Sequence, residues 1–219
     1  MTQFNIQVVS DNVCPWCYMG KKRLDKAIQQ YTSKYPDSQD TWNITWKPFY
    51  LNPHAPKASV DKAEYYQSKF GPERTRGIFA NLSQLGLSEG IHYKFGGRTG
   101  NTRDSHRLVQ LGRERGLGTR VIEELFKGYF ENEQDITSHG FLQTAGEAAG
   151  LDAAEVRDWL GSDKGGKEVD REVQEAYEEG VSGVPNFTVG GYEIPGAQEP
   201  VAFVKLFERI KSKERESKA

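Results

Sequence analysis

The chain has 219 residues, which exceeds the length of one minimal domain and falls short of two full ones. Its 29 lysines and arginines nearly balance its 31 aspartates and glutamates, and the net charge is −2. We therefore expect no nucleic-acid partner and no binding to an anionic membrane surface. The longest apolar run covers residues 201–204, which is far too short to cross a bilayer. Two cysteines exclude a scaffold built on disulfides.

The first fifty residues predict a strand, a helix and a second strand. Residues 4–10 and 42–50 are rich in β-branched and aromatic side chains, and apolar residues recur at helical spacing over 17–31. The helix should begin beside Pro15, because proline fits the first helical turn. The two strands joined by such a crossover are expected to be parallel. No basic stretch precedes an apolar segment at the start, so we expect a cytoplasmic protein.

The middle of the chain shows helical patterns alone, separated by glycine-rich breaks. Pro72 is placed to open one helix and Gly86 to close it, and residues 96–100 form a glycine-rich loop. Asn101 or Thr102 can cap the next helix. We therefore expect a block of helices that contributes no strand to the main sheet.

After Gly180 the pattern returns to strands. Residues 186–189 and 192–194 read as two short strands separated by two glycines, which is a strong β-hairpin signal. A terminal helix follows, and the charged tail over residues 211–219 is expected to fray.

This order of elements predicts an α/β fold in which both ends of the chain build one mixed four-stranded sheet. Residues 1–55 and 162–219 would form this discontinuous domain. Residues 56–161 would form an all-helical insertion subdomain that lies over one side of the sheet.

The segment Cys14-Pro15-Trp16-Cys17 carries the predicted chemistry. Two thiols at positions i and i+3 of a first helical turn can reach disulfide geometry. Cys14 would lie at the positive end of the helix, which favours a thiolate and makes this sulfur the attacking one. Cys17 would lie one turn deeper, shielded, and act as the resolving thiol.

Zinc binding is the alternative for two cysteines at this spacing. It needs two more ligands, and the histidines of the chain are widely scattered at positions 54, 92, 106 and 139. We therefore predict no metal site.

Val184-Pro185 stands directly before the first hairpin strand. A trans proline at a strand start is the ordinary interpretation. A cis bond would place the Val184 backbone opposite the cysteines, where its N–H and C=O could pair with an extended substrate. The Cys14–Cys17 motif on the first helix favours the cis form.

Together these motifs resemble the DsbA family of thioredoxin-fold oxidoreductases over nearly the whole chain. The stretches SDNVCPWCYMGKKRL, NTRDSHRL and GVSGVPNFTVGGYEIPGAQ are similar to its FrnE-like subgroup. Relatives of that subgroup include kappa-class glutathione transferases and 2-hydroxychromene-2-carboxylate isomerases, which have a serine, usually without a second cysteine, where this chain has Cys14 and Cys17. That departure favours dithiol exchange.

The resemblance implies a thioredoxin-like fold and several further site residues. Trp16 is a candidate apolar platform for substrate, or it packs beside the helix. His106 is a candidate proton carrier above the cysteines, or a structural histidine. Gln198 is a candidate contact for a glutathione-like carboxylate. Asp11 is expected to cap the cysteine helix rather than to relay a proton to Cys17.

The sequence thus predicts an enzyme, a thiol–disulfide oxidoreductase that acts on protein or small-molecule thiols and disulfides as a monomer or homodimer. No tightly bound cofactor is expected, and glutathione is a candidate co-substrate. The alternatives are a glutathione-dependent transferase or isomerase of the kappa type, and a non-catalytic redox-sensing binding module.

Overall fold

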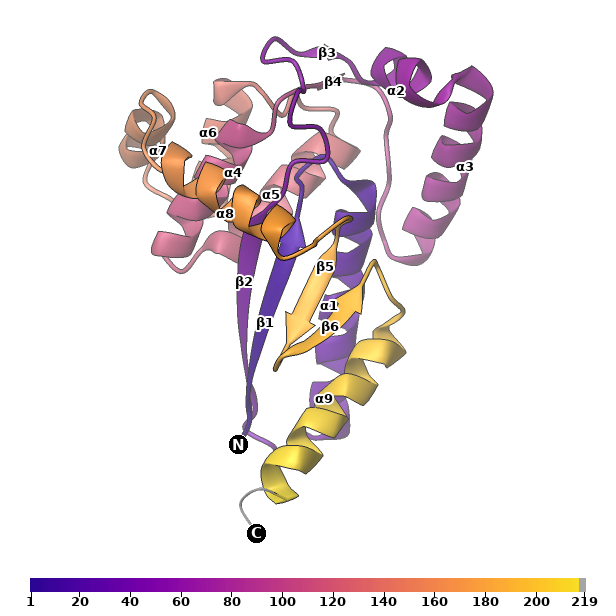
Figure 1. Cartoon of the computed structure of the whole chain (residues 1–219), viewed down its shortest axis with the longest axis vertical. Helices are drawn as coiled ribbons and strands as arrows, with labels where there is room; N and C mark the ends of the chain where they lie inside the picture. Colours follow the sequence, from indigo (N-terminus) through magenta and orange to yellow (C-terminus); the bar gives the residue numbers. More distant parts are fainter. Residues whose placement is uncertain (217–219) are drawn as a thin grey trace.

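The computed structural model describes residues 1–216. Figure 1 labels the elements. In chain order they are β1 (Gln3–Ser10), α1 (Pro15–Lys34), β2 (Thr41–Pro48), β3 (Val60–Asp61), α2 (Lys62–Phe70), α3 (Pro72–Ser88), β4 (Arg98–Thr99), α4 (Arg103–Glu114), α5 (Gly118–Glu131), α6 (His139–Ala148), α7 (Ala153–Leu160), α8 (Gly166–Glu178), β5 (Asn186–Val189), β6 (Tyr192–Pro195) and α9 (Pro200–Glu216).

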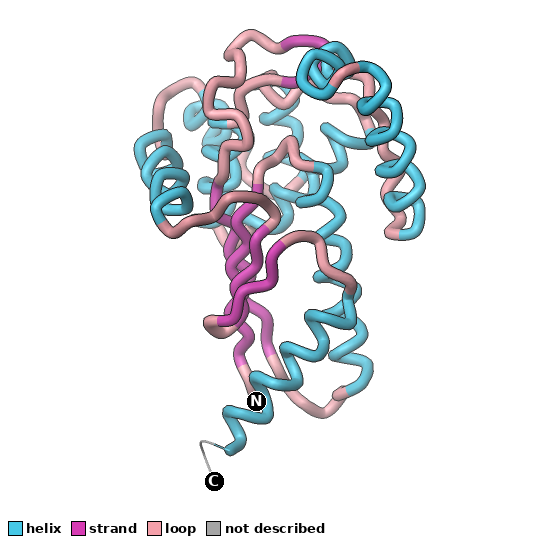
Figure 2. The backbone as a smooth tube through the Cα atoms, turned by 45° about the vertical axis from the view of Figure 1, so that its right-hand side comes forward, coloured by secondary structure: helices cyan, strands magenta, loops and turns pink. Residues whose placement is uncertain are grey.

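The main sheet joins the two ends of the chain, as predicted. Its strand order is β2-β1-β5-β6, and the strands come from residues 3–10, 41–48, 186–189 and 192–195. β1 and β2 are parallel, whereas β5 is antiparallel to β1 and to β6. Figure 2 shows these strands as one twisted layer with helices around it. The mixed four-stranded sheet is confirmed.

The turn between β5 and β6 explains why two glycines stand there. Gly190 and Gly191 have φ angles of 54° and 83°. Both values lie in the left-handed region, which side chains other than glycine rarely adopt. The turn therefore closes a two-residue hairpin, as the sequence predicts.

An aromatic layer holds the sheet against α1 and α9. Phe4 of β1 stacks on Trp42 of β2 with ring centres 4.5 Å apart, and it packs against Tyr31 of α1 at 5.5 Å. Phe207 of α9 lies 5.2 Å from Phe4 and 4.7 Å from Trp42. Three of these rings are buried and Trp42 is partly buried, so together they exclude water from one side of the sheet and stabilise it by apolar contact.

The segment between β2 and β5 divides into two parts. Helices α4 and α5 contact each other and also β2, and α8 contacts both α4 and β2. By contrast, α2 and α3 form an arm that stands apart from the sheet, over the N-terminal end of α1 (Figure 1). In addition to the expected helices, this segment contains a short antiparallel ladder in which Val60 pairs with Thr99.

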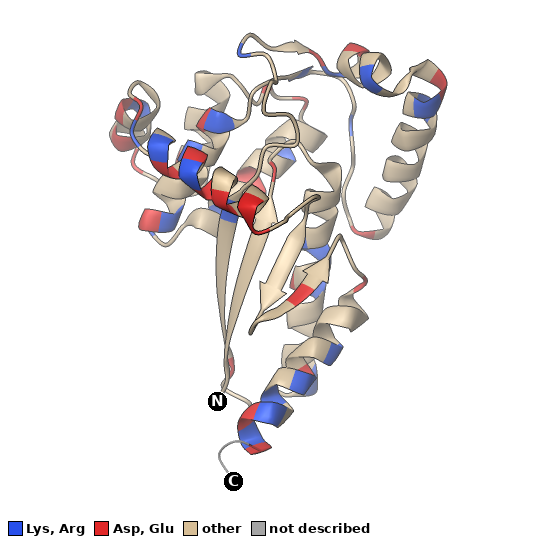
Figure 3. Cartoon of the chain, viewed as in Figure 1, with Lys and Arg blue, Asp and Glu red and all other residues tan. Residues whose placement is uncertain are grey.

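The described part of the chain differs from expectation at its C-terminal end. Helix α9 continues through Glu216, where the sequence predicts a frayed tail from residue 211; residues 217–219 lie outside the described residues. Within residues 1–216, no helix is long and apolar enough to cross a membrane. Figure 3 shows basic and acidic residues interspersed along the helices.

Candidate functional site

The cysteine motif lies where β1 passes into α1. Cys14 is the residue immediately before the helix, and Pro15 occupies the first turn. The backbone N–H of Cys14 donates to the Asp11 carbonyl at 3.0 Å, and the Cys14 carbonyl accepts from the N–H of Cys17 at 3.0 Å. A tight turn and the first helical hydrogen bonds therefore hold the two cysteines at the positive end of a 20-residue helix.

The two thiols are free and have different surroundings. Cys17 is fully buried at 0% exposure, and Cys14 is 3% exposed. Burial raises the pKa of the Cys17 thiol well above its ordinary value, and the neighbouring Cys14 sulfur raises it further. Cys17 is therefore held as a protonated thiol behind Cys14, which lines a cavity.

The Val184–Pro185 segment lies beside this pair. The peptide bond between the two residues is cis. The Cys14 thiol donates to the Val184 carbonyl, with 3.5 Å between sulfur and oxygen. Pro185 is buried against α1, where a Cβ atom on Gly20 would lie 3.0 Å from the proline ring. The absence of a side chain at Gly20 thus allows the Pro185 loop to approach the cysteine helix.

A cavity of about 400 Å³ opens beside Cys14. On the cysteine side its wall includes Trp16, which is 38% exposed, and Val184. On the opposite side it is lined by apolar and aromatic side chains of α2 and α3: Tyr65, Tyr66, Phe70, Ile78 and Leu82. The cavity therefore lies between the α2–α3 arm and the N-terminal end of the cysteine helix.

The structure places two other predicted residues away from this wall. His106 is buried, and its Nε2 lies 3.1 Å from the Phe49 carbonyl. The Asn12 amide faces its Nδ1 at 3.4 Å, so the network assigns the ring proton to Nε2. Gln198 is exposed, and its amide donates to the Pro195 carbonyl at 2.9 Å. Neither side chain is part of the cavity lining.

Asp11 does not cap α1, so that prediction is wrong. Its Oδ2 accepts the backbone N–H of Leu51 at 2.8 Å, while Oδ1 lies 3.5 Å from His106 Nε2. Because the His106 proton is directed to Phe49, Oδ1 has no hydrogen bond within residues 1–216. Asp11 instead ties the loop before Cys14 to the loop after β2.

The residues of the cavity's second wall were not predicted from the sequence. Tyr65, Tyr66 and Phe70 belong to an ordinary amphipathic helix pattern, and nothing local shows that this helix faces Cys14. Their only available signal was the aromatic content of α2. Among residues 1–216, no cluster of three or more His, Cys, Asp or Glu side chains could hold a metal ion.

Several known proteins resemble this chain in sequence and in structure. The YwbO protein of Bacillus subtilis is 27% identical over 98% of both chains. The crystal structure of a probable DsbA oxidoreductase, SCO1869 from Streptomyces coelicolor, is 29% identical and has a TM-score of 0.84, with 94% of this chain and 89% of that chain covered.

A 2-hydroxychromene-2-carboxylate isomerase shares the fold, with a TM-score of 0.68 at 14% identity over 97% of this chain and 98% of that chain. The model of the DsbA-like thioredoxin domain family matches residues 5–208. A match of this extent, together with the sheet and the cysteine helix, places the protein: the chain belongs to the family of DsbA-like thioredoxin domains.

Proposed function

We propose that this protein is a thiol–disulfide oxidoreductase of the FrnE-like subgroup, in which Cys14 attacks and Cys17 resolves. One observation carries the proposal. The free Cys14 thiol stands on a cavity wall at the N-terminus of α1, while the free Cys17 thiol is enclosed behind it. The helix N-terminus favours negative charge on the outer sulfur, and burial opposes ionisation of the inner one.

The reaction needs two exchanges. The Cys14 thiolate attacks one sulfur of a substrate disulfide, so a bond to Cys14 forms, the substrate disulfide breaks, and one substrate thiolate leaves and takes up a proton. Cys17 then loses its proton and attacks the Cys14 sulfur, which releases the second substrate thiol. The substrate gains two electrons and two protons, and the protein ends with a Cys14–Cys17 disulfide.

The protein must then be reduced again by an external thiol. We propose glutathione as this co-substrate: two glutathione molecules give up two electrons and two protons and become glutathione disulfide. The Val184 carbonyl, which contacts the Cys14 sulfur, is placed to accept a hydrogen bond from the backbone of a bound thiol peptide.

The test measures glutathione-coupled reduction of bis(2-hydroxyethyl) disulfide by the whole protein. We expect Cys14→Ser to abolish turnover and Cys17→Ser to accumulate a mixed disulfide on Cys14, visible as a mass increase. Tyr192→Phe, which removes one exposed hydroxyl on β6, is the control and should leave turnover unchanged. Full turnover by Cys14→Ser would refute the proposal.

A kappa-type glutathione transferase or isomerase is the second candidate, because a cavity of about 400 Å³ beside Cys14 suits a small second substrate. The same variants separate the two. Glutathione conjugation that survives Cys17→Ser would support the second candidate. Absence of both activities would support a redox-sensing binding module.

A further inference from the structure

We infer that the natural substrate is a compact, largely apolar sulfur compound rather than a protein disulfide, and that the Tyr66 hydroxyl provides its polar contact opposite Cys14. This inference rests on the proposed function, and it specifies the substrate class of the same site.

Access to Cys14 is the first observation. The side chain is 3% exposed, although it lines the cavity. A disulfide must therefore enter the cavity to reach the sulfur. The volume of about 400 Å³ falls at the lower end of pockets that hold one small molecule, roughly 300–1,000 Å³. A disulfide carried on a folded protein would have to bring its sulfurs inside this cavity, beside the α2–α3 arm.

The chemistry of the walls is the second observation. The α2–α3 arm presents Tyr65, Tyr66, Phe70, Ile78 and Leu82 to the cavity, with the polar Lys69 and Asn81 among them. Trp16 and Val184 face them from the cysteine side. A ligand that buries apolar or aromatic surface against these side chains is stabilised by the hydrophobic effect and by contacts between rings. A strongly hydrated substrate would lose its water without gaining hydrogen bonds from most of this lining.

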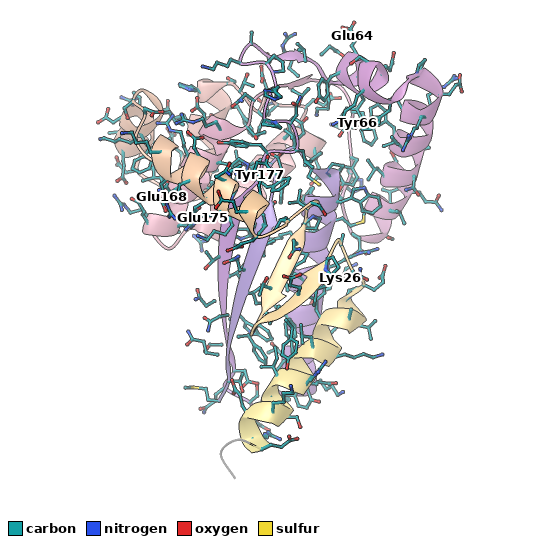
Figure 4. The ribbon with its side chains drawn as sticks, in the orientation of Figure 1. Lys26, Glu64, Tyr66, Glu168, Glu175 and Tyr177 are labelled. Atoms are coloured by element: carbon teal, nitrogen blue, oxygen red, sulfur yellow. The ribbon has the colours of Figure 1, made fainter. Side chains whose placement is uncertain are left out.

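Tyr66 is the third observation. Its ring is held between α2 and α3 by Phe70 at 5.8 Å and by Phe79 at 5.2 Å. Within residues 1–216 its hydroxyl has no hydrogen-bond partner. Figure 4 shows Tyr66 below α2, on the side of the N-terminal end of α1.

Charge adds to this arrangement. Burial raises the pKa of Tyr66, and negative charge on Cys14 raises it further, so the hydroxyl remains a donor. A donor over the cavity can hydrogen-bond the sulfur that leaves as a thiolate when Cys14 attacks.

The experiment compares three disulfides under single-turnover conditions with the fully reduced protein. They are 4,4′-dithiodipyridine, which is aromatic and uncharged, bis(2-hydroxyethyl) disulfide, which is small and polar, and insulin. Each rate constant is divided by that of dithiothreitol with the same disulfide, which removes the intrinsic reactivity of the substrate. Because the chain has two cysteines, every reaction is assigned to Cys14 or Cys17 by mass.

We expect the normalised rate for dithiodipyridine to exceed that for bis(2-hydroxyethyl) disulfide by about tenfold or more, and the rate for insulin to be the lowest. Tyr66→Phe keeps the ring and should slow dithiodipyridine cleavage by about tenfold, the effect of a lost hydrogen bond to a charged group. Tyr66→Ala removes the ring from the cavity wall on the side of α2. It should raise the rate with insulin relative to the rate with the aromatic disulfide. Tyr192→Phe, the control, should change none of these ratios.

Equal normalised rates for the three disulfides, or a Tyr66→Phe variant that behaves like Tyr192→Phe, would overturn the inference. If Tyr66→Ala fails to fold, the substrate series and Tyr66→Phe decide alone. Failure of the proposed function and failure of the substrate class give different results. Loss of all Cys14-dependent exchange, including that with bis(2-hydroxyethyl) disulfide, overturns the proposed function. Unselective exchange overturns only the substrate class.

Discussion

Replacing Gly20 by alanine tests the close approach of α1 to the Pro185 loop. A Cβ atom at this position would lie 3.0 Å from the Pro185 ring and 3.0 Å from the Phe187 ring. Both rings are buried, so neither can turn into solvent. Overpacking of this kind costs about 1–3 kcal/mol, whereas alanine in a helix interior gains about 1 kcal/mol over glycine.

The expected net effect of Gly20→Ala is a loss of up to about 2 kcal/mol, the difference between these two contributions. Gly77 provides the matched control, because it is exposed within α3 and its added Cβ would contact nothing within 4 Å. Gly77→Ala should therefore stabilise the protein by about 0.5–1 kcal/mol.

The assay is urea unfolding of the reduced proteins, with the two midpoints compared at unchanged slope. We expect the Gly20→Ala midpoint to fall and the Gly77→Ala midpoint to rise. If Gly20→Ala stabilises the protein as much as Gly77→Ala does, the close packing of α1 against the Pro185 loop is refuted.

Two further predictions concern thiol access and a buried carboxylate. Iodoacetamide at neutral pH should modify Cys14 before Cys17, because Cys17 is fully buried and its pKa is raised; mass mapping that finds Cys17 labelled first would contradict this assignment. Glu172 is 3% exposed, and Glu172→Gln should cost about 1.5–3 kcal/mol in urea unfolding, because the carboxylate accepts from Arg113 at 2.6 Å and from Lys47. Burial alone would raise the Glu172 pKa, but these hydrogen bonds outweigh it and lower the pKa, so the unfolded chain binds the proton more tightly. The stabilisation is present above the ordinary value of 4.5 and is lost as the pH falls through the lowered one, and Glu172→Gln should flatten this dependence; an unchanged acid limb would refute the assignment.

Local patterns predicted the sheet and the cysteine helix well. The strands alternate or cluster β-branched side chains, Pro15 marks the start of α1, and the pair Gly190–Gly191 fixes a hairpin. In each of these cases the determining residues are neighbours in sequence, so the chain itself displays the signal.

The remaining features depend on contacts between distant segments. Asp11 resembled a helix cap, but Leu51 supplies the N–H that it accepts, forty residues away in sequence. Strands β3 and β4 have two residues each, which is too short for any periodicity. The position of Tyr66 opposite Cys14 depends on how the α2–α3 arm folds back, which no local pattern encodes.

The long connection between β2 and β5 adds little to the entropic cost of forming the sheet. Gln3 pairs with Thr41 across a connection that contains α1, whereas Ile6 pairs with Val189 across most of the chain. Since loop-closure entropy grows with the logarithm of loop length, the longer closure costs only about 1.4 kcal/mol more than the shorter one. Segments of very different length can therefore occupy this place while the cysteine helix and the Pro185 loop stay fixed. The cysteine helix and the cavity wall that the α2–α3 arm supplies can therefore change independently of each other during evolution.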